Sequence, residues 1–148
     1  MISESKIVVR YAETDQMGIV HHSVYPVWYE VARTDFIQKA GMRYDVMEKM
    51  GFWLPVIEVT GKYHATTTYG DELRVTAQIN MLTPSKIEFL YKVYKVESDN
   101  PVNEGTTLHP FTSDRLKPLN IRKHAPDIFE LLKSACEPNT KTKHMRRG

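Results

Sequence analysis

The sequence has very little cysteine and no long apolar segment. Its single cysteine, Cys136, excludes an internal disulfide, a pattern typical of proteins from a reducing, intracellular compartment. No apolar run approaches the ~18 residues of a membrane-spanning helix. The N-terminus "MISESKIVV" lacks the charged start and long apolar stretch of a signal peptide. We therefore expect a cytoplasmic protein that does not contact a membrane, and we interpret Cys136, in "LLKSACE", as a packing residue and not a nucleophile.

A strong excess of one charge is also missing. The 20 basic and 18 acidic residues leave a formal charge of +2, which is too balanced to predict nucleic acid as a partner. The 148 residues, 41% of them hydrophobic, fit one compact domain, which we place at residues 1–136. No acid follows Glu137, and residues 137–148 are expected to form a basic, disordered tail.

The first third of the chain predicts a strand, a loop and a long helix. Residues 5–12, "SKIVVRYA", are rich in β-branched side chains and predict a strand. The loop of residues 13–22 precedes a helix over 23–41, with Ser23 as its N-cap, Pro26 in its first turn and Gly41 as its C-terminal cap. Apolar residues recur along this helix at spacings of three and four, and aromatic neighbours widen the stripe; they are Val24, Tyr25, Val27, Trp28, Tyr29, Val31, Ala32 and Phe36. We expect the helix to be buried on most sides.

The rest of the chain is mostly strand-like. A short helix is expected at 44–51 and a last helix at 126–136, which begins with a proline. Between these helices, turn signals separate four strand-like runs, at residues 52–69, 71–82, 85–96 and 104–114. This order predicts an α+β fold with helices on one face of an antiparallel sheet.

Asp15 lies in the loop just before the long helix, close to Gly18, His21 and His22. A helix N-terminus offers free N–H groups and partial positive charge, which suit the oxyanion that forms when a carbonyl carbon is attacked. A carboxylate opposite them can serve as a general base or as a nucleophile. The alternative is that Asp15 is only a turn or capping residue. The adjacent histidines suggest a metal, but no second acidic ligand is placed for one, so we expect neither metal nor cofactor.

Four segments resemble one family in the right order. They are "VRYAETDQMGIVHHSVYPVWYEVAR", "LPVIEVTGKYHATTTYGDEL", "SKIEFLYKVYK" and "EGTTLHPFTSDRLKPLNI". Together they resemble the hotdog-fold acyl-CoA thioesterases, in the branch of 4-hydroxybenzoyl-CoA thioesterase and YbgC, over residues 5 to 132. One departure is His21, where many relatives carry an aromatic residue.

The resemblance implies a long central helix wrapped by an antiparallel sheet, and hydrolysis of acyl-CoA or acyl carrier protein thioesters. It implies that Asp15 is catalytic, that the backbone N–H near His22 binds the oxyanion, and that Tyr25 and Glu30 line or brace the site. Asp15, His22 and Tyr25 are the candidate catalytic residues. Gly18 and Ser23 are assigned to substrate binding. Two chains are expected to pair edge to edge, as a dimer or tetramer with the substrate at the interface, and pairing also removes an exposed sheet edge.

The phosphates of coenzyme A or phosphopantetheine need cationic partners, for which Lys86, Lys92, Arg115 and Lys117 are candidates. His64 and His109 are interpreted as structural. Glu58 is the alternative catalytic acid, because another hotdog branch uses a glutamate. The alternative functions are a non-catalytic acyl-thioester-binding protein and a dehydratase. The presence of Asp15 disfavours both.

Overall fold

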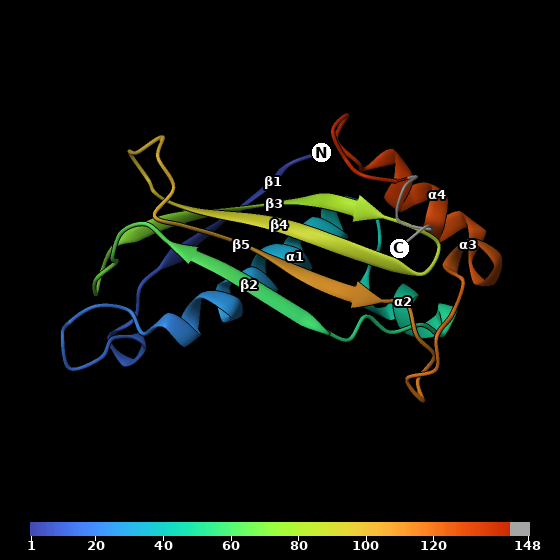
Figure 1. Ribbon diagram of the computed structural model, residues 1–148, viewed down its shortest axis with the longest axis horizontal. Coiled ribbons are helices and arrows are strands. Elements are labelled where there is room, and N and C mark those ends of the chain that lie inside the picture. Colours follow the sequence, from blue (N-terminus) through green and yellow to red (C-terminus); the bar gives the residue numbers. More distant parts are fainter. Residues whose placement is uncertain (143–148) are drawn as a thin grey trace.

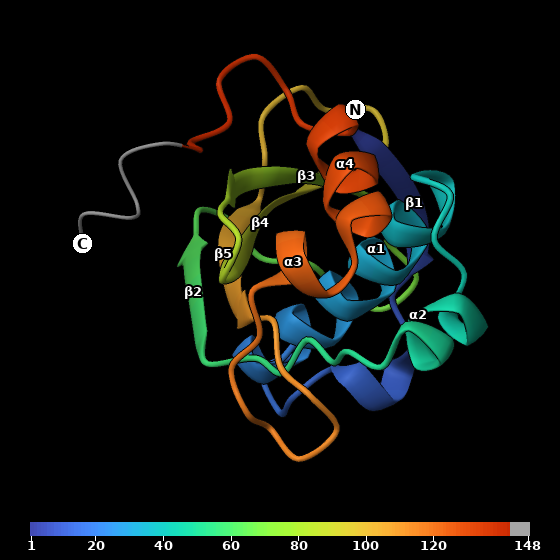
Figure 2. The ribbon, with the colours of Figure 1, turned by 90° about the vertical axis from the view of Figure 1, so that its right-hand side faces the viewer.

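The computed structural model describes residues 1–142. Its strands are β1 (Ser3–Val8), β2 (Glu58–Tyr63), β3 (Glu72–Leu82), β4 (Lys86–Lys95) and β5 (Asn103–Pro110). Its helices are α1 (Tyr25–Lys39), α2 (Tyr44–Met50), α3 (Ile121–His124) and α4 (Pro126–Ser134). The strands form one antiparallel sheet in the order β1-β3-β4-β5-β2. The long helix α1 lies along one face of this sheet, and α3 and α4 cover one end of the molecule (Figures 1 and 2).

The core lies between α1 and the central strands. Alternate residues of β3, β4 and β5 are fully buried, as expected for a sheet with one covered face. Aromatic rings join the two layers: Tyr29 of α1 stacks on Tyr91 at 4.5 Å between ring centroids, and Phe36 meets Phe89 edge to face at 5.6 Å. Both separations lie within the favourable range for aromatic pairs. The α+β prediction is confirmed.

The long helix is buried on one face only, which corrects the prediction of burial on most sides. Trp28, Ala32 and Phe36 are buried, whereas Val27 is 53% and Val31 39% exposed. The sheet covers a single side of α1, so the apolar residues on the opposite side stay partly exposed. Pro26 lies in the first turn as predicted.

The start of the helix also differs from the prediction. Ser23 does not cap it, because a 3₁₀ turn (His22–Val24) precedes α1, and the His21 imidazole accepts the N–H of Ser23 instead. At the other end, Gly41 has φ +101° as expected for a C-terminal cap.

Several boundaries also shift. The first strand ends at Val8, and Tyr11–Glu13 form a 3₁₀ turn. Only residues 58–63 of the expected strand 52–69 are in a strand, and α3 was not predicted. The part of the expected tail that is described follows β3: Lys141 N–H donates to Asn80 O at 3.1 Å, and Lys141 O accepts from Leu82 N–H at 2.9 Å. Lys141 of the expected tail thus pairs with the sheet, and residues 143–148 lie outside the described residues.

The edge strand β2 is the most exposed part of the sheet. All six of its residues are exposed, and among the described strands it pairs with β5 alone. Large apolar side chains are exposed on it and on the segment before it: Trp53, Val56, Ile57, Val59 and Tyr63. A bare apolar strand edge favours pairing with another strand. Within residues 1–142, no helix is long and apolar enough to cross a membrane.

Candidate active site

Asp15 sits in a tight loop closed by the bridge between Thr14 and Val20. Its N–H donates to Ile19 O at 2.8 Å, and its carbonyl accepts from Gly18 N–H at 3.0 Å. Gly18 has φ +79°, a conformation that glycine adopts without the strain of a side chain. The Asp15 Oδ1 atom accepts the Met17 N–H at 2.8 Å. The second carboxylate oxygen has no protein donor among the described residues.

A buried carboxylate fixes this loop against the helix. Glu13 is 7% exposed and accepts hydrogen bonds from the Trp28 indole at 3.1 Å and the Arg10 N–H at 2.8 Å. Its backbone carbonyl accepts the His21 N–H at 3.0 Å. On the other side of the loop, Val20 N–H donates to Thr67 O at 2.9 Å. These bonds hold the Asp15 loop in one position relative to the start of the helix.

The N–H groups at the helix start are nearly all occupied. Those of His21 and Val24 bind the carbonyls of Glu13 and His21, and that of Ser23 binds the His21 ring. Of these four N–H groups, that of His22 alone has no acceptor within residues 1–142. An unsatisfied N–H at a helix start is a ready donor to an anion.

A cavity of about 230 Å³ brings Asp15 together with His22, Tyr25 and Tyr63. The Tyr63 hydroxyl donates to His22 O at 2.8 Å, and the rings of Tyr25 and Tyr63 meet edge to face at 5.2 Å. The Tyr25 hydroxyl is hydrogen-bonded to Thr67 Oγ1 at 2.9 Å. Burial raises the pKa of Tyr25 and of Tyr63, so both hydroxyls stay neutral and neither is a base at neutral pH.

Two of the other expected site residues line a second recess, which Asp15 also borders. Gly18 and Ser23 line a wider recess of about 940 Å³ that Asp15 also borders. The Ser23 hydroxyl is hydrogen-bonded to His21 Nδ1 at 2.8 Å. His21 and Ser23 are therefore part of the support for the helix start.

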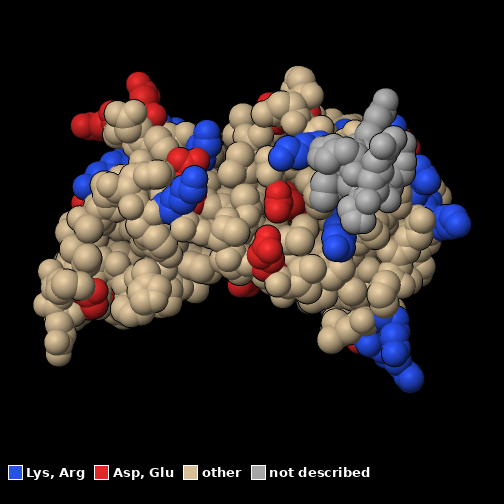
Figure 3. Space-filling model, in the orientation of Figure 1, with Lys and Arg blue, Asp and Glu red and all other residues tan. Residues whose placement is uncertain are grey.

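The remaining expected site residues lie elsewhere in the protomer. Glu30 is exposed on the outer face of α1, beside Val27 and Val31, and it does not line the Asp15 cavity of its own protomer. Lys86, which begins β4, and the loop with Arg115 and Lys117 are at the opposite end of the molecule from the Asp15 loop (Figure 1). Basic side chains project from that end in Figure 3.

The sequence did not single out Tyr63, Glu13 or Thr67. Tyr63 and Thr67 are more than 40 residues from Asp15 in the sequence. The fold of the chain around β2 brings them to the Asp15 loop, and no local spacing indicates this approach. Glu13 is two residues before Asp15, but only its long-range bond to Trp28 distinguishes it from a solvated acid. Within the described part of the chain, no three metal-ligating side chains gather. Burial raises the pKa of the Cys136 thiol, which disfavours the thiolate and agrees with a packing role.

Residues 9–125 match the model of the thioesterase-like superfamily, and the chain belongs to that family. The expected family, the hotdog fold and the enzyme class of thioesterases are thereby confirmed. The chain is 36% identical over 126 residues to YneP of Bacillus subtilis, named for acyl-CoA thioesterase activity, covering 85% of this chain and 91% of YneP.

Two solved structures are similar along nearly the whole chain. DHNA-CoA thioesterase from Staphylococcus aureus is 30% identical, with a TM-score of 0.83 over 90% of this chain and 89% of its own. Protein TT1821 from Thermus thermophilus is 35% identical, with a TM-score of 0.82 over 90% and 98%.

Proposed function

We propose that this protein hydrolyses acyl thioesters of coenzyme A or of an acyl carrier protein, with Asp15 as the catalytic carboxylate. The observation that carries the proposal is that one cavity is lined by both Asp15 and His22. Within residues 1–142, one carboxylate oxygen of Asp15 accepts no hydrogen bond, and the backbone N–H of His22 has no acceptor. The relatives named for acyl-CoA thioesterase activity support the same class of substrate.

The thioester carbonyl oxygen accepts the His22 N–H, which stabilises the negative charge that develops there. Asp15 then acts in one of two ways. As a general base it takes a proton from water, and the hydroxide oxygen bonds to the acyl carbon. As a nucleophile it forms a mixed anhydride with the acyl group, which water then hydrolyses. In both routes the C–S bond breaks, the thiolate leaves and gains a proton, and the free acid is released.

The surrounding residues position this chemistry. Glu13 and Thr67 hold the loop and the helix start together, and the Tyr63 hydroxyl fixes the carbonyl of His22. Tyr25 supplies an apolar wall and a neutral hydroxyl bound to Thr67. Since hydrogen bonds of this kind restrict both reacting groups, little reorganisation is needed when charge develops.

The active unit is proposed to be a dimer that pairs through β2. Two antiparallel β2 strands that pair about their middle, near Thr60 and Gly61, place the Tyr63 end of one strand beside the Glu58 end of the other. Each Asp15 cavity then lies next to the end of the partner subunit that carries Lys86, Arg115 and Lys117. In this arrangement the basic residues reach the phosphates of a substrate bound at the Asp15 of the other subunit, although they are far from Asp15 in one protomer.

Thiol release from a panel of acyl-CoA esters tests the activity. The panel spans acetyl to palmitoyl and includes benzoyl, followed by the same acyl groups on acyl carrier protein. Release above the spontaneous rate is expected for at least one class, and the rates along the panel show which acyl groups fit. A folded, dimeric protein that releases no thiol from any ester would favour the non-catalytic thioester-binding alternative.

A further inference from the structure

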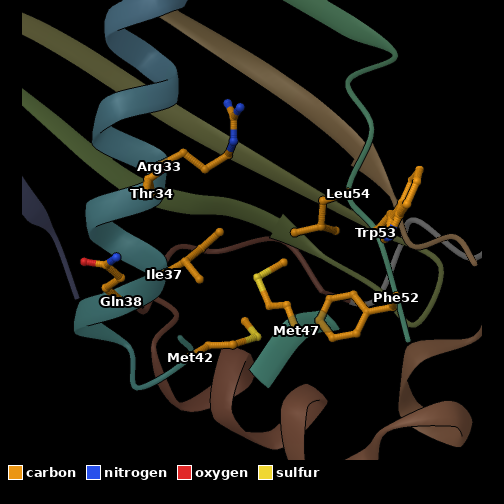
Figure 4. A pocket seen from close by; sticks show the side chains of 9 residues that line it. All are labelled: Arg33, Thr34, Ile37, Gln38, Met42, Met47, Phe52, Trp53 and Leu54. Atoms are coloured by element: carbon orange, nitrogen blue, oxygen red, sulfur yellow. The ribbon is translucent and has the colours of Figure 1, made fainter. Parts of the chain in front are cut away.

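A second cavity, of about 210 Å³, lies beside the C-terminal half of α1 (Figure 4). Apolar side chains from α1, α2, the turn between them and the segment before β2 form most of its wall: Ile37, Met42, Met47, Phe52, Trp53 and Leu54. Three polar residues complete the wall, Arg33, Thr34 and Gln38, and of these Arg33 alone carries a charge. Figure 4 shows Arg33 extending from α1 toward the segment that carries Leu54. We call this cavity the Arg33 pocket.

A chain of hydrogen bonds holds the Arg33 side chain in place. The guanidinium donates to the Tyr91 hydroxyl at 3.1 Å, Tyr91 is 2.6 Å from Thr107 Oγ1, and Thr107 is 2.7 Å from His109 Nε2. His109 Nδ1 is 3.1 Å from Leu54 O. A carbonyl only accepts, so Nδ1 carries the proton and Nε2 accepts from Thr107, which in turn accepts from Tyr91. The chain has one consistent direction and needs no further partner at its His109 end.

The positive charge of Arg33 is not neutralised by these contacts. Tyr91, Thr107 and His109 are neutral, and burial together with Arg33 lowers the pKa of His109 to about 4. Across the described residues, no carboxylate lies within ion-pair distance of Arg33. A guanidinium has five N–H donors, and Tyr91 takes one. The half-buried Arg33 therefore offers donors and charge to a largely apolar cavity, an arrangement suited to an amphipathic ligand with an acceptor group.

We propose that the Arg33 pocket binds the end of the acyl group farthest from the thioester, and that Arg33 selects acyl groups carrying a carboxylate or similar hydrogen-bond acceptor there. This inference rests on the proposed thioester hydrolysis. A cavity of about 150 Å³ is large enough for benzene, so the Arg33 pocket fits one ring or a short branched chain with a polar substituent.

In the proposed dimer, the Arg33 pocket of one subunit lies close to the Asp15 cavity of the other. In antiparallel pairing about the middle of β2, the segment that carries Leu54 in one chain runs beside Thr66 and Thr67 of the other. Thr66 lines the Asp15 cavity. An acyl group bound at one Asp15 can therefore extend into the Arg33 pocket of the second subunit.

Methionine methyl NMR tests the pocket without any turnover. Met42 and Met47 line the Arg33 pocket, whereas Met17 lines the Asp15 cavity, so the two sites report separately. Benzoate titrated into protein labelled with ¹³C at the methionine methyl groups is expected to shift Met42 and Met47 more than Met17. Arg33→Gln keeps a polar N–H group at this position but removes the charge. We expect it to weaken benzoate binding about tenfold or more, because hydrogen bonds to a charged group are involved. Toluene, which has the ring but no carboxylate, should bind both proteins alike.

Two further variants serve as controls: one for the loss of a charge outside the pocket, and one for a folding defect in Arg33→Gln. Arg43→Gln removes an exposed arginine just after α1, one that pairs with Asp45 and does not line the pocket, and it should leave benzoate binding unchanged. Arg33→Lys keeps the charge and should retain binding within a few fold even if Arg33→Gln does not fold. Shifts confined to Met17, equal benzoate affinity in folded Arg33→Gln, or loss of binding in folded Arg33→Lys would each overturn the proposal. Since benzoate is not hydrolysed, inactivity toward thioesters and failure of the pocket are distinguished.

Discussion

The backbone N–H of His22 is the single donor on which the proposed oxyanion site depends. His22 begins a 3₁₀ turn, where a proline is accepted, and His21 has φ −64° and ψ 139°, which is compatible with a following proline. His22→Pro therefore removes the N–H with little strain, whereas His22→Ala removes only the ring. We expect kcat to fall about 10²- to 10³-fold in His22→Pro, the usual effect of losing one oxyanion donor.

His22→Ala is the matched control and should keep most of the activity, because its N–H is intact. Circular dichroism and native mass would show that both variants fold. Equal, large losses in the two variants would instead assign the role to the imidazole.

His109 predicts how stability depends on pH. Its pKa is lowered from 6.5 to about 4 in the folded protein, so between these values the unfolded chain binds more protons than the folded chain. The stability that the neutral His109 contributes is therefore fully present above pH 6.5 and is lost as the pH falls toward 4. At about 1.4 kcal/mol per pKa unit, the loss is about 3 kcal/mol.

Urea unfolding of the wild type and of His109→Gln across this pH range isolates the effect, since all other titrating groups are shared. The stability difference between the two proteins should shrink by about 3 kcal/mol as the pH falls. A constant difference would show that His109 is not held neutral by its surroundings.

At the scale of elements, the pairing of β2 with β5 depends on a glycine. A Cβ at Gly105 would lie 2.2 Å from Thr60 O and 2.6 Å from the Tyr29 hydroxyl, and the backbone atom cannot move without breaking the strand pair. Overpacking typically costs about 1–3 kcal/mol. We therefore expect Gly105→Ala to lose about 3 kcal/mol or fail to fold.

Gly61, which is paired directly with Gly105, offers the comparison. The atoms nearest to a Cβ there belong to the Tyr63 side chain, at 3.3 Å and beyond, so Gly61→Ala should lose much less stability. Equal midpoints of urea unfolding for the two variants would show that the close approach at Gly105 is not rigid.

The elements illustrate what local sequence predicts and what it does not. Pro26 and Gly41 correctly predicted the first turn and the C-terminal cap of α1, because each residue's own backbone preference determines its place in the helix. The exposed side of that helix was missed, since the positions of Val27 and Val31 depend on which face the sheet covers. His21, and not Ser23, is the capping residue, because a 3₁₀ turn precedes the first turn of α1.

For the candidate site, Asp15 and His22 were recognised from contiguous sequence, and the structure places them at one cavity. Tyr63 and Thr67 come from a distant segment, and their approach is set by the sheet order. Glu30 and Lys86 were assigned from position in a motif or from charge alone, and neither lines the cavity in one protomer.

At the scale of the whole molecule, the exposed β2 edge predicts a dimer of twice the 17.2 kDa chain mass. Val59, in β2, is 46% exposed, and Val96, just after β4, is 47% exposed. Val59→Glu puts a charge into the proposed interface and should yield a monomer in analytical ultracentrifugation, with reduced activity. Val96→Glu, which is matched in exposure, should remain a dimer. A dimer that survives Val59→Glu with unchanged affinity would place the interface elsewhere.

The most direct test of the central claim is the rate of thiol release by Asp15→Asn on the best acyl thioester of the panel. Asparagine keeps an acceptor for the Met17 N–H but can neither take a proton nor attack the acyl carbon. The rate should fall at least about 100-fold, as expected for loss of a general base, in a protein that remains folded and dimeric. Glu58→Gln, which removes the alternative acid, should retain activity. A near-normal rate in Asp15→Asn, with the loss appearing in Glu58→Gln instead, would contradict the assignment of the catalytic carboxylate.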